Sequence, residues 1–216
     1  MNPQSLEEIA ARTNYQTKHA ASKAFKKHFG IPPSAFRKQT TNTSLLTDEE
    51  NREAVTLNPV IREIDDKQVV YIRIVDWYGS PESYRNTWKQ LGEFGVKNNL
   101  LNKDTEWTGL SFDDPTITQP EKCRFYACFT TNEIVKPTVA FGVQQIQGGL
   151  YAIFTLKGAY SGLTKLYYSI YMRWLPNSEY VLRGGKSFEV YLNHPDRVSE
   201  NELLAEIYVP VKKKEE

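Results

Sequence analysis

One short stretch, residues 186–195, combines an acid with a strictly alternating apolar pattern: Lys-Ser-Phe-Glu-Val-Tyr-Leu-Asn-His-Pro. Neighbouring side chains of a β-strand point to opposite faces, so Phe188 and Val190 would share one face, and Glu189 and Tyr191 the other. A carboxylate among aromatic rings suits an organic cation, because the rings present negative faces and the acid neutralises a charge that apolar walls would make costly. Glu189 is therefore the first candidate for a binding residue.

A related pattern occurs eighty positions earlier, where residues 108–115 align with 188–195. The register continues into a second apolar run, 123–129 against 203–209. Such self-similarity indicates an internal duplication. Glu189 aligns with Gly109, so only the second copy carries the acid, and the small Gly109 is expected to leave room for a ligand.

The elements that must position the acid follow the same order in both copies: strand, helix, strand, strand. In the first copy we expect strands at 69–75, 108–112 and 123–129 with a helix at 81–94, and in the second, strands at 150–156, 188–192 and 203–209 with a helix at 163–174. This order predicts an α+β domain in which helices cover one face of an antiparallel sheet.

The face away from these helices is expected to hold the site. If the aliphatic and Phe positions of each strand face the helices, alternation places an aromatic-rich set on the far side. The predicted ligand-binding residues are Glu189, Tyr191, Tyr208, Tyr126, Trp107, Tyr71, Tyr151 and Gly109. Two copies packed side by side would frame a cleft between them, where ligand sites often lie.

The first forty residues follow another plan. Ser5 and Glu8 form a capping-box pattern at the start of a helix that is expected to run to about Arg12. A second helix is predicted at 16–29, ended by Gly30, with a short third helix starting at 32–34. Helix, turn, helix with an excess of lysine suits DNA contact, and the alternative is a helical segment with solvated lysines.

Composition excludes several classes of protein. The 216 residues, 40% of them apolar, are enough for a core, and the net charge of +1 indicates no particular partner. We find no membrane-spanning run or signal-peptide layout, and so predict a cytoplasmic protein. Cys123 and Cys128 are expected to be reduced thiols, and the three histidines lack ligand spacing, so neither a metal nor a cofactor is predicted.

Two segments of the N-terminal region, 5–17 and 24–37, carry a specific signature that ends in Phe-Gly-Ile-Pro-Pro-Ser-Ala-Phe-Arg. This signature resembles the second helix-turn-helix of AraC-type transcription regulators, although Asn14 and Ala21 replace residues usual in that family. The family joins two such motifs, and this sequence carries only the second, which weakens the expectation of DNA binding. By resemblance, the DNA-binding residues are Gln16, Thr17, Lys18 and Ser22 toward bases and Lys23 toward phosphate.

A second resemblance covers roughly residues 57–213. Its motifs are Tyr-Ser-Gly at 160–162, Trp-Leu-Pro at 174–176, the stretch 186–195 and Glu-Ile-Tyr-Val-Pro-Val at 206–211. Together they resemble a GyrI-like small-molecule-binding domain, which implies hydrophobic, often cationic ligands and places the pocket acid at Glu189. The predicted organisation is a partial helix-turn-helix at 1–40, a linker at 41–56 and the GyrI-like domain at 57–213, with repeats at about 60–132 and 143–211.

Two functions from different classes follow. The first is an AraC-type transcription regulator whose GyrI-like domain binds a hydrophobic, cationic effector, and no enzymatic activity is expected of it. The alternative is a stand-alone GyrI-like enzyme or drug-sequestering protein. In that alternative Glu189 acts as general base in hydrolysis of strained cyclopropane-type toxins, and Tyr191 or Tyr160 positions the reacting carbon. Inhibition of DNA gyrase is a third possibility, implied by the resemblance alone.

Overall fold

The computed structural model describes residues 5–13, 15–29, 31–35, 57–115 and 118–214. The chain divides into two compact units, Met1–Thr56 and Leu57–Glu216, which are treated separately below. The predicted linker at 41–56, together with Asn14 and Gly30, lies outside the described residues.

The N-terminal unit contains α1 (Leu6–Arg12) and α2 (Lys18–Phe29), and residues 33–35 are also helical. The predicted capping box is present, because Ser5 Oγ accepts from the Glu8 amide (3.2 Å) while Glu8 Oε2 accepts from the Ser5 amide (2.7 Å). Helix α2 begins two residues later than predicted. The Thr17 hydroxyl accepts from the Ala20 amide at 3.1 Å, which makes Thr17 the cap.

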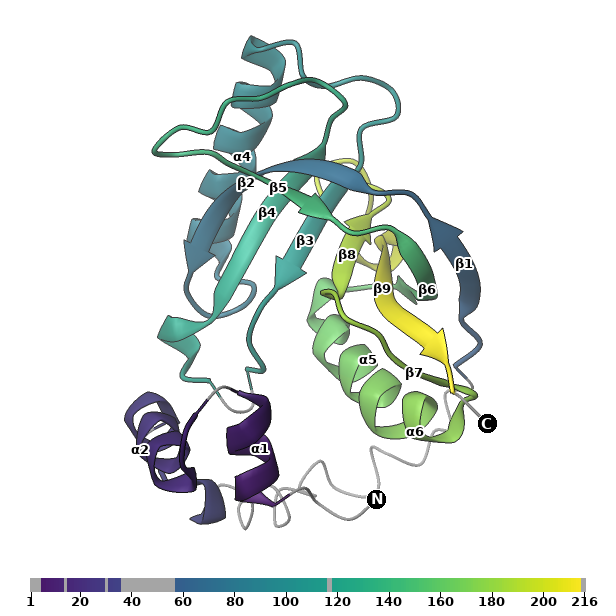
Figure 1. The fold of residues 1–216 in the computed structure, drawn as a ribbon. Coiled ribbons are helices and arrows are strands. Elements are labelled where there is room, and N and C mark those ends of the chain that lie inside the picture. The colour runs from purple at the N-terminus through teal and green to yellow at the C-terminus, as the bar shows by residue number, and fades with distance from the viewer. Residues whose placement is uncertain (1–4, 14, 30, 36–56, 116–117, 215–216) are drawn as a thin grey trace. The chain divides into compact units, whose positions relative to one another are not determined.

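In the C-terminal unit the same order of elements occurs twice (Figure 1). The first half comprises β1 (Val60–Ile64), β2 (Lys67–Val75), α4 (Pro81–Lys97), β3 (Trp107–Ser111), η1 (Pro120–Lys122) and β4 (Arg124–Thr130). The second comprises β5 (Gly142–Ile146), β6 (Gly149–Lys157), η2 (Tyr160–Gly162), α5 (Leu163–Ser169), η3 (Ile170–Trp174), α6 (Leu175–Asn177), β7 (Tyr180–Leu182), β8 (Phe188–Tyr191), η4 (Glu200–Glu202) and β9 (Leu204–Lys213). All six predicted strands and both predicted helices are present. Strands β1, β5 and β7 were not predicted.

All described strand pairs are antiparallel, in the order β1-β6-β9-β8-β3-β4-β2-β5, with β7 beside β9. Edge strand β1 pairs with β6 at one end of this order, yet only residues 65–66 join it to β2 at the other end. Residues 147–148 join β5 to β6 in the same way. Because two residues reach only about 7 Å, the sheet must curl until its ends approach, giving a half-barrel.

Gly148 shows how tightly these connections pack. A Cβ atom at Gly148 would lie 2.6 Å from the Ile64 carbonyl oxygen and 2.7 Å from the Asp66 amide nitrogen. Only glycine fits at this position, because a Cβ atom would collide with backbone atoms, which cannot move aside as a flexible side chain could.

Three cores hold the unit together. The inner core, inside the curl, draws on both halves and consists of Val69, Leu110, Cys128, Ile146, Tyr151, Ile153, Phe188, Val190 and Tyr208. A second core lies under α4 and a third under α5 to α6, on the other face of the sheet. Both faces of the sheet are therefore apolar, and helices cover only the outer face.

The second helical segment runs from Leu163 to Asn177 through a π-helical turn, Ile170–Trp174. The Leu175 amide bonds the Ile170 carbonyl, five residues back. The helix was expected to end at Trp174, but it continues to Asn177 and includes Pro176 within α6. Proline has no backbone N–H to donate. Because the π turn lies directly before Pro176, the helix has no regular series of i to i−4 hydrogen bonds there for the proline to interrupt.

Candidate functional site

The two central strands, β3 and β8, face opposite to the prediction. Glu189 lies on the helix-covered face, where it bonds Tyr167 of α5, whereas Phe188 and Val190 point into the inner core. On β3, Trp107 packs in the core under α4 while Leu110 points inward. The prediction assumed that apolar residues face helices. In a curled sheet the inner face needs no helix, because the sheet buries that face against itself.

The eight predicted ligand-binding residues therefore do not form one site. Glu189, Tyr191, Trp107 and Gly109 meet on the helix side. The other four belong to the inner core or pack against it. The rings of Tyr71 and Tyr126 stack with centroids 4.2 Å apart, and those of Tyr151 and Tyr208 pack on Phe188. The prediction from alternation that all eight residues share one face of the sheet is therefore wrong.

The helix-side residues meet where the halves join. Strand β3 pairs with β8 so that Gly109 lies opposite Glu189, and Trp107 opposite Tyr191. Gly109 and Glu189 are also the equivalent positions of the two copies. An approximate two-fold axis thus passes between them, and Glu189 lies beside this axis where β3 pairs with β8.

The Glu189 carboxylate is buried, with 3% of the residue exposed, and is held by three hydroxyl groups. Ser111 Oγ and Tyr167 Oη each donate to Oε1 at 3.1 Å, and Tyr191 Oη donates to Oε2 at 2.5 Å. These donors come from β3, α5 and β8, so both halves position the acid. Sequence reasoning missed Tyr167, and Ser111 was not among the predicted ligand-binding residues. The helical spacing of Tyr167 and Tyr171 was the available signal.

Burial raises the pKa of Glu189 above its ordinary value, while the hydrogen bonds from Tyr191, Ser111 and Tyr167 act in the opposite direction. All three donors are neutral. Within the described part of the chain, Glu189 has no ion-pair or hydrogen-bond contact with a lysine, arginine or histidine. A buried carboxylate without a cation is costly to ionise, and a bound cation would relieve that cost.

Gly109 does not leave the room that was expected. A Cβ atom there would lie 2.6 Å from Tyr191 Oη and 2.7 Å from Phe125 Cζ, so these two side chains fill the space. The Tyr191 ring also contacts Trp88 of α4 (5.6 Å, edge to face) and Tyr160 (5.1 Å). We define the aromatic end of the site as Trp88, Trp107, Tyr160 and Tyr191, which are all half-buried.

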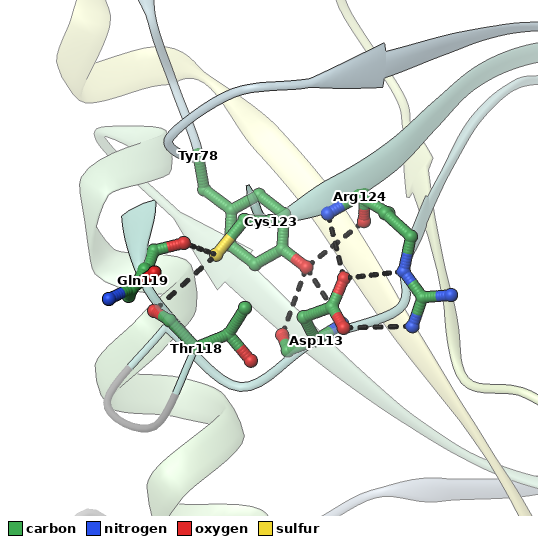
Figure 2. A network of polar contacts seen from close by, with 6 residues as sticks. All are labelled: Tyr78, Asp113, Thr118, Gln119, Cys123 and Arg124. Atoms are coloured by element: carbon green, nitrogen blue, oxygen red, sulfur yellow. Dashed lines mark hydrogen bonds and ion pairs between the residues drawn. The ribbon is translucent and has the colours of Figure 1, made fainter. Parts of the chain in front are cut away.

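The polar motif after each hairpin strand has a structural role. Asp113 accepts from the Arg124 amide (2.7 Å) and holds the Arg124 guanidinium through both carboxylate oxygens (2.9 and 2.8 Å; Figure 2). Tyr78 Oη donates to the Asp113 carbonyl and accepts from the Asp113 amide, both at 2.9 Å. These contacts staple the start of β4 to the end of β3, and Cys123, a buried free thiol, lies beside them.

The second half repeats this staple with weaker groups. Asn193 Oδ1 accepts from the Leu204 amide at 2.9 Å, and Tyr160 Oη donates to the Asn193 carbonyl at 3.3 Å. Leucine at 204 offers no charge to Asn193. The Asn-His-Pro sequence at the end of residues 186–195 thus closes a loop. His194 is an exposed turn residue and does not contact Glu189.

A comparison with protein families identifies the unit. Residues 57–212 match the GyrI-like small molecule binding domain. The chain belongs to the GyrI-like family.

Curated relatives agree with this assignment. The probable transcriptional regulator YgiV of Escherichia coli K12 is 31% identical over 105 residues, which are 48% of this chain and 65% of YgiV. The DNA gyrase inhibitor of Serratia proteamaculans is 31% identical over 158 residues, 69% of this chain and 97% of the inhibitor. The chain thus covers just under two thirds of YgiV but nearly all of the gyrase inhibitor.

Solved structures share the GyrI-like fold. The EcmrR C-terminal domain superposes with a TM-score of 0.62 at 20% identity, covering 74% of this chain and 100% of that domain. An EcmrR–DNA complex gives 0.64 at 18% identity, with 98% of this chain and 78% of that chain covered. At these identities the likeness concerns the fold alone.

The predicted DNA-contacting residues, outside the GyrI-like unit, lie just before α2 and in its first half. Gln16, Thr17, Lys18 and Lys23 are exposed and Ser22 is half-buried. Two of them already have local partners, because Thr17 caps α2 and Lys18 Nζ pairs with Glu7 Oε1 at 2.7 Å. Both sides of that ion pair are exposed, so it would yield readily to phosphate.

Two searches of the described residues complete the survey. None of their helices is long and apolar enough to cross a membrane. They contain no group of three or more His, Cys, Asp or Glu side chains that could hold a metal ion.

Proposed function

We propose that the GyrI-like unit binds a hydrophobic organic cation at Glu189, and that the chain is a transcription regulator of AraC type that responds to this ligand. The observation that carries the first part is the buried Glu189 carboxylate, held by neutral hydroxyls and facing aromatic rings. A cation would supply the missing charge, and Trp88, Tyr160 and Tyr191 would surround it with negative ring faces.

Binding at this position requires the covering side chains to move. Tyr191 fills the space above Gly109, and Tyr167 covers the acid from α5. Rotamer changes of this kind are common when ligands bind. A ligand would then change the affinity for DNA only if it binds the DNA-binding state and the non-binding state of the protein with different affinities.

The ligand proposal is tested by isothermal titration of phenyltrimethylammonium, a small aromatic cation. Glu189→Gln keeps the shape of the side chain but removes its charge, and we expect the affinity to fall by about tenfold or more. Glu206→Gln is the matched control, since Glu206 bonds Tyr208 on β9 and makes no contact with Glu189. Equal affinity of wild type and Glu189→Gln would refute the site.

The regulatory part rests on the N-terminal signature, the exposed residues at the start of α2 and the naming of YgiV as a probable transcriptional regulator. Fluorescence anisotropy with duplex DNA should show binding that weakens as salt increases, with a shallower salt dependence in Lys23→Ala. Protein lacking residues 1–49 is the control. If it binds DNA as well as the full chain does, the helix-turn-helix assignment fails.

The hydrolytic alternative uses the same acid, and one contact favours it. Tyr191 Oη lies 2.5 Å from Glu189 Oε2, and burial raises the pKa of this carboxylate, as a general base requires. Mass spectrometry of a cyclopropane-bearing toxin incubated with the protein separates the two functions. Unaltered ligand supports sensing, whereas a product with one added water that is absent with Glu189→Gln supports hydrolysis.

A further inference from the structure

The helix-side face has two different ends on either side of Glu189. Beyond the acid from the aromatic end, the side chains become small and carry hydroxyls. We call Ser111, Ser187 and Tyr171 the hydroxyl end. Ser111 Oγ donates to Glu189, and Ser187 Oγ bonds Tyr171 Oη at 2.6 Å. All three residues are half-buried, which leaves them within reach of a ligand that enters between the helices.

Two parallel rungs connect the second helical segment to β8 and the residue before it. Tyr167 bonds Glu189 and Tyr171 bonds Ser187, with the two tyrosine rings parallel (5°) and their centroids 6.2 Å apart. Ser187 and Glu189 are two residues apart on one face of an extended chain, a spacing of about 7 Å. The rungs therefore hold a carboxylate and a hydroxyl pair at a fixed separation.

The π turn affects the second rung. It begins at Ile170, between Tyr167 and Tyr171, and a π turn places more residues in each turn than an α-helix does. Tyr171 lies within this turn, so the change of register affects the direction of its side chain. Its hydroxyl bonds the Ser187 hydroxyl. Isolated π turns occur frequently at functional sites.

From this arrangement we infer that the hydroxyl end is a second, neutral polar subsite. It would select organic cations that carry a hydroxyl, carbonyl or amide group about 7 Å from the charge, because serine and tyrosine hydroxyls both donate and accept hydrogen bonds. The ligand would lie along β8, with its charge at Glu189 beside the aromatic end, its neutral polar group at Ser187 and its apolar body between them. This inference rests on the proposed function.

The test compares two ligands of nearly equal size, the trimethylanilinium ions with a para-hydroxymethyl and a para-ethyl group. Isothermal titration of the wild type should show tighter binding of the hydroxymethyl ion by about three- to tenfold, the usual gain from one hydrogen bond. Ser187→Ala should remove this preference and leave the affinity for the ethyl ion unchanged. Tyr171→Phe, which keeps the ring, serves as a second variant and should reduce the preference.

Ser169→Ala is the matched control, because the Ser169 hydroxyl bonds the Lys165 carbonyl within its own helix. It should keep the full preference. Equal binding of the two ions to the wild type, both lost in Glu189→Gln, would overturn the hydroxyl subsite and leave the cation site standing. If neither ion binds in a Glu189-dependent way, the proposed function fails and the subsite with it.

Discussion

The two halves of the GyrI-like unit share one backbone plan, and they differ where chemistry could occur. The first half has glycine at the two-fold axis and a charged staple at its hairpin, Asp113 with Arg124. The second half has Glu189 at the axis and a neutral staple, Asn193 with Leu204. The comparison indicates a division of roles: the first half provides rigidity and the glycine against which Tyr191 packs, and the second provides the functional group.

The largest expected effect comes from removing the asymmetry at the axis. Gly109→Ala places a Cβ atom 2.6 Å from Tyr191 Oη, so Tyr191 and Phe125 must shift and the Tyr191–Glu189 bond is disturbed. We expect a loss of about 2–3 kcal/mol in the free energy of unfolding, measured by urea denaturation. Gly184→Ala is the matched control, since nothing lies within 4 Å of its added Cβ. Similar stability of both variants would contradict the packing described at the axis.

The staples are expected to differ in strength. Asp113→Ala removes charge-assisted bonds to Arg124 and should cost about 2 kcal/mol, while Asn193→Ala removes neutral bonds and should cost about 1 kcal/mol. Asp113→Asn should fall between them, because the amide oxygen can still accept from the Arg124 backbone. Denaturation of the three variants under one condition tests this order. A larger loss from Asn193→Ala would reverse the proposed roles of the halves.

The pH dependence sharpens the comparison at Glu189. Burial raises the pKa of Glu189 in the folded state above the ordinary value of 4.5 that it regains on unfolding. The unfolded chain then releases this proton at lower pH than the folded chain, so stability falls as pH rises from 4.5 through the folded pKa, by at most about 1.4 kcal/mol per pH unit. Glu189→Gln should lack this decline. Stability curves of wild type and variant that run parallel with pH would show that the acid is not desolvated.

The smallest effect concerns the staple tyrosines. Tyr78 donates to one carbonyl and accepts from one amide of Asp113 at 2.9 Å, whereas Tyr160 makes a single bond of 3.3 Å to Asn193. Tyr78→Phe should cost about 1 kcal/mol and Tyr160→Phe less than about 0.5 kcal/mol in thermal unfolding. Because both variants keep the ring, an equal loss would contradict the stronger hydroxyl contacts assigned to Tyr78.

Much of the fold followed from the sequence, because alternation and the eighty-residue register locate strands reliably when side chains are either clearly apolar or clearly polar. The placement of Glu189 and Tyr191 on one face of a strand was predicted for the same reason. The sequence could not predict which side chains of β3 and β8 face the helices. Both faces of the curled sheet are buried, and alternation alone does not say which face a helix covers. Glu189 itself misled the prediction. A buried acid breaks the rule that polar residues face outward, and here its carboxylate is satisfied by three hydroxyl donors, of which Ser111 and Tyr167 are distant in sequence.

The short connections at 65–66 and 147–148 have a consequence for how the unit can be divided. Each half gives its first strand to the opposite half, β1 to β6 and β5 to β2. A fragment that ends at residue 132 would keep β1 without the neighbour it needs and leave one side of β2 bare. Two copies of that fragment could satisfy each other only by trading strands, so separate expression of one repeat should yield dimers or aggregates, and a stable monomer would require both repeats in one chain.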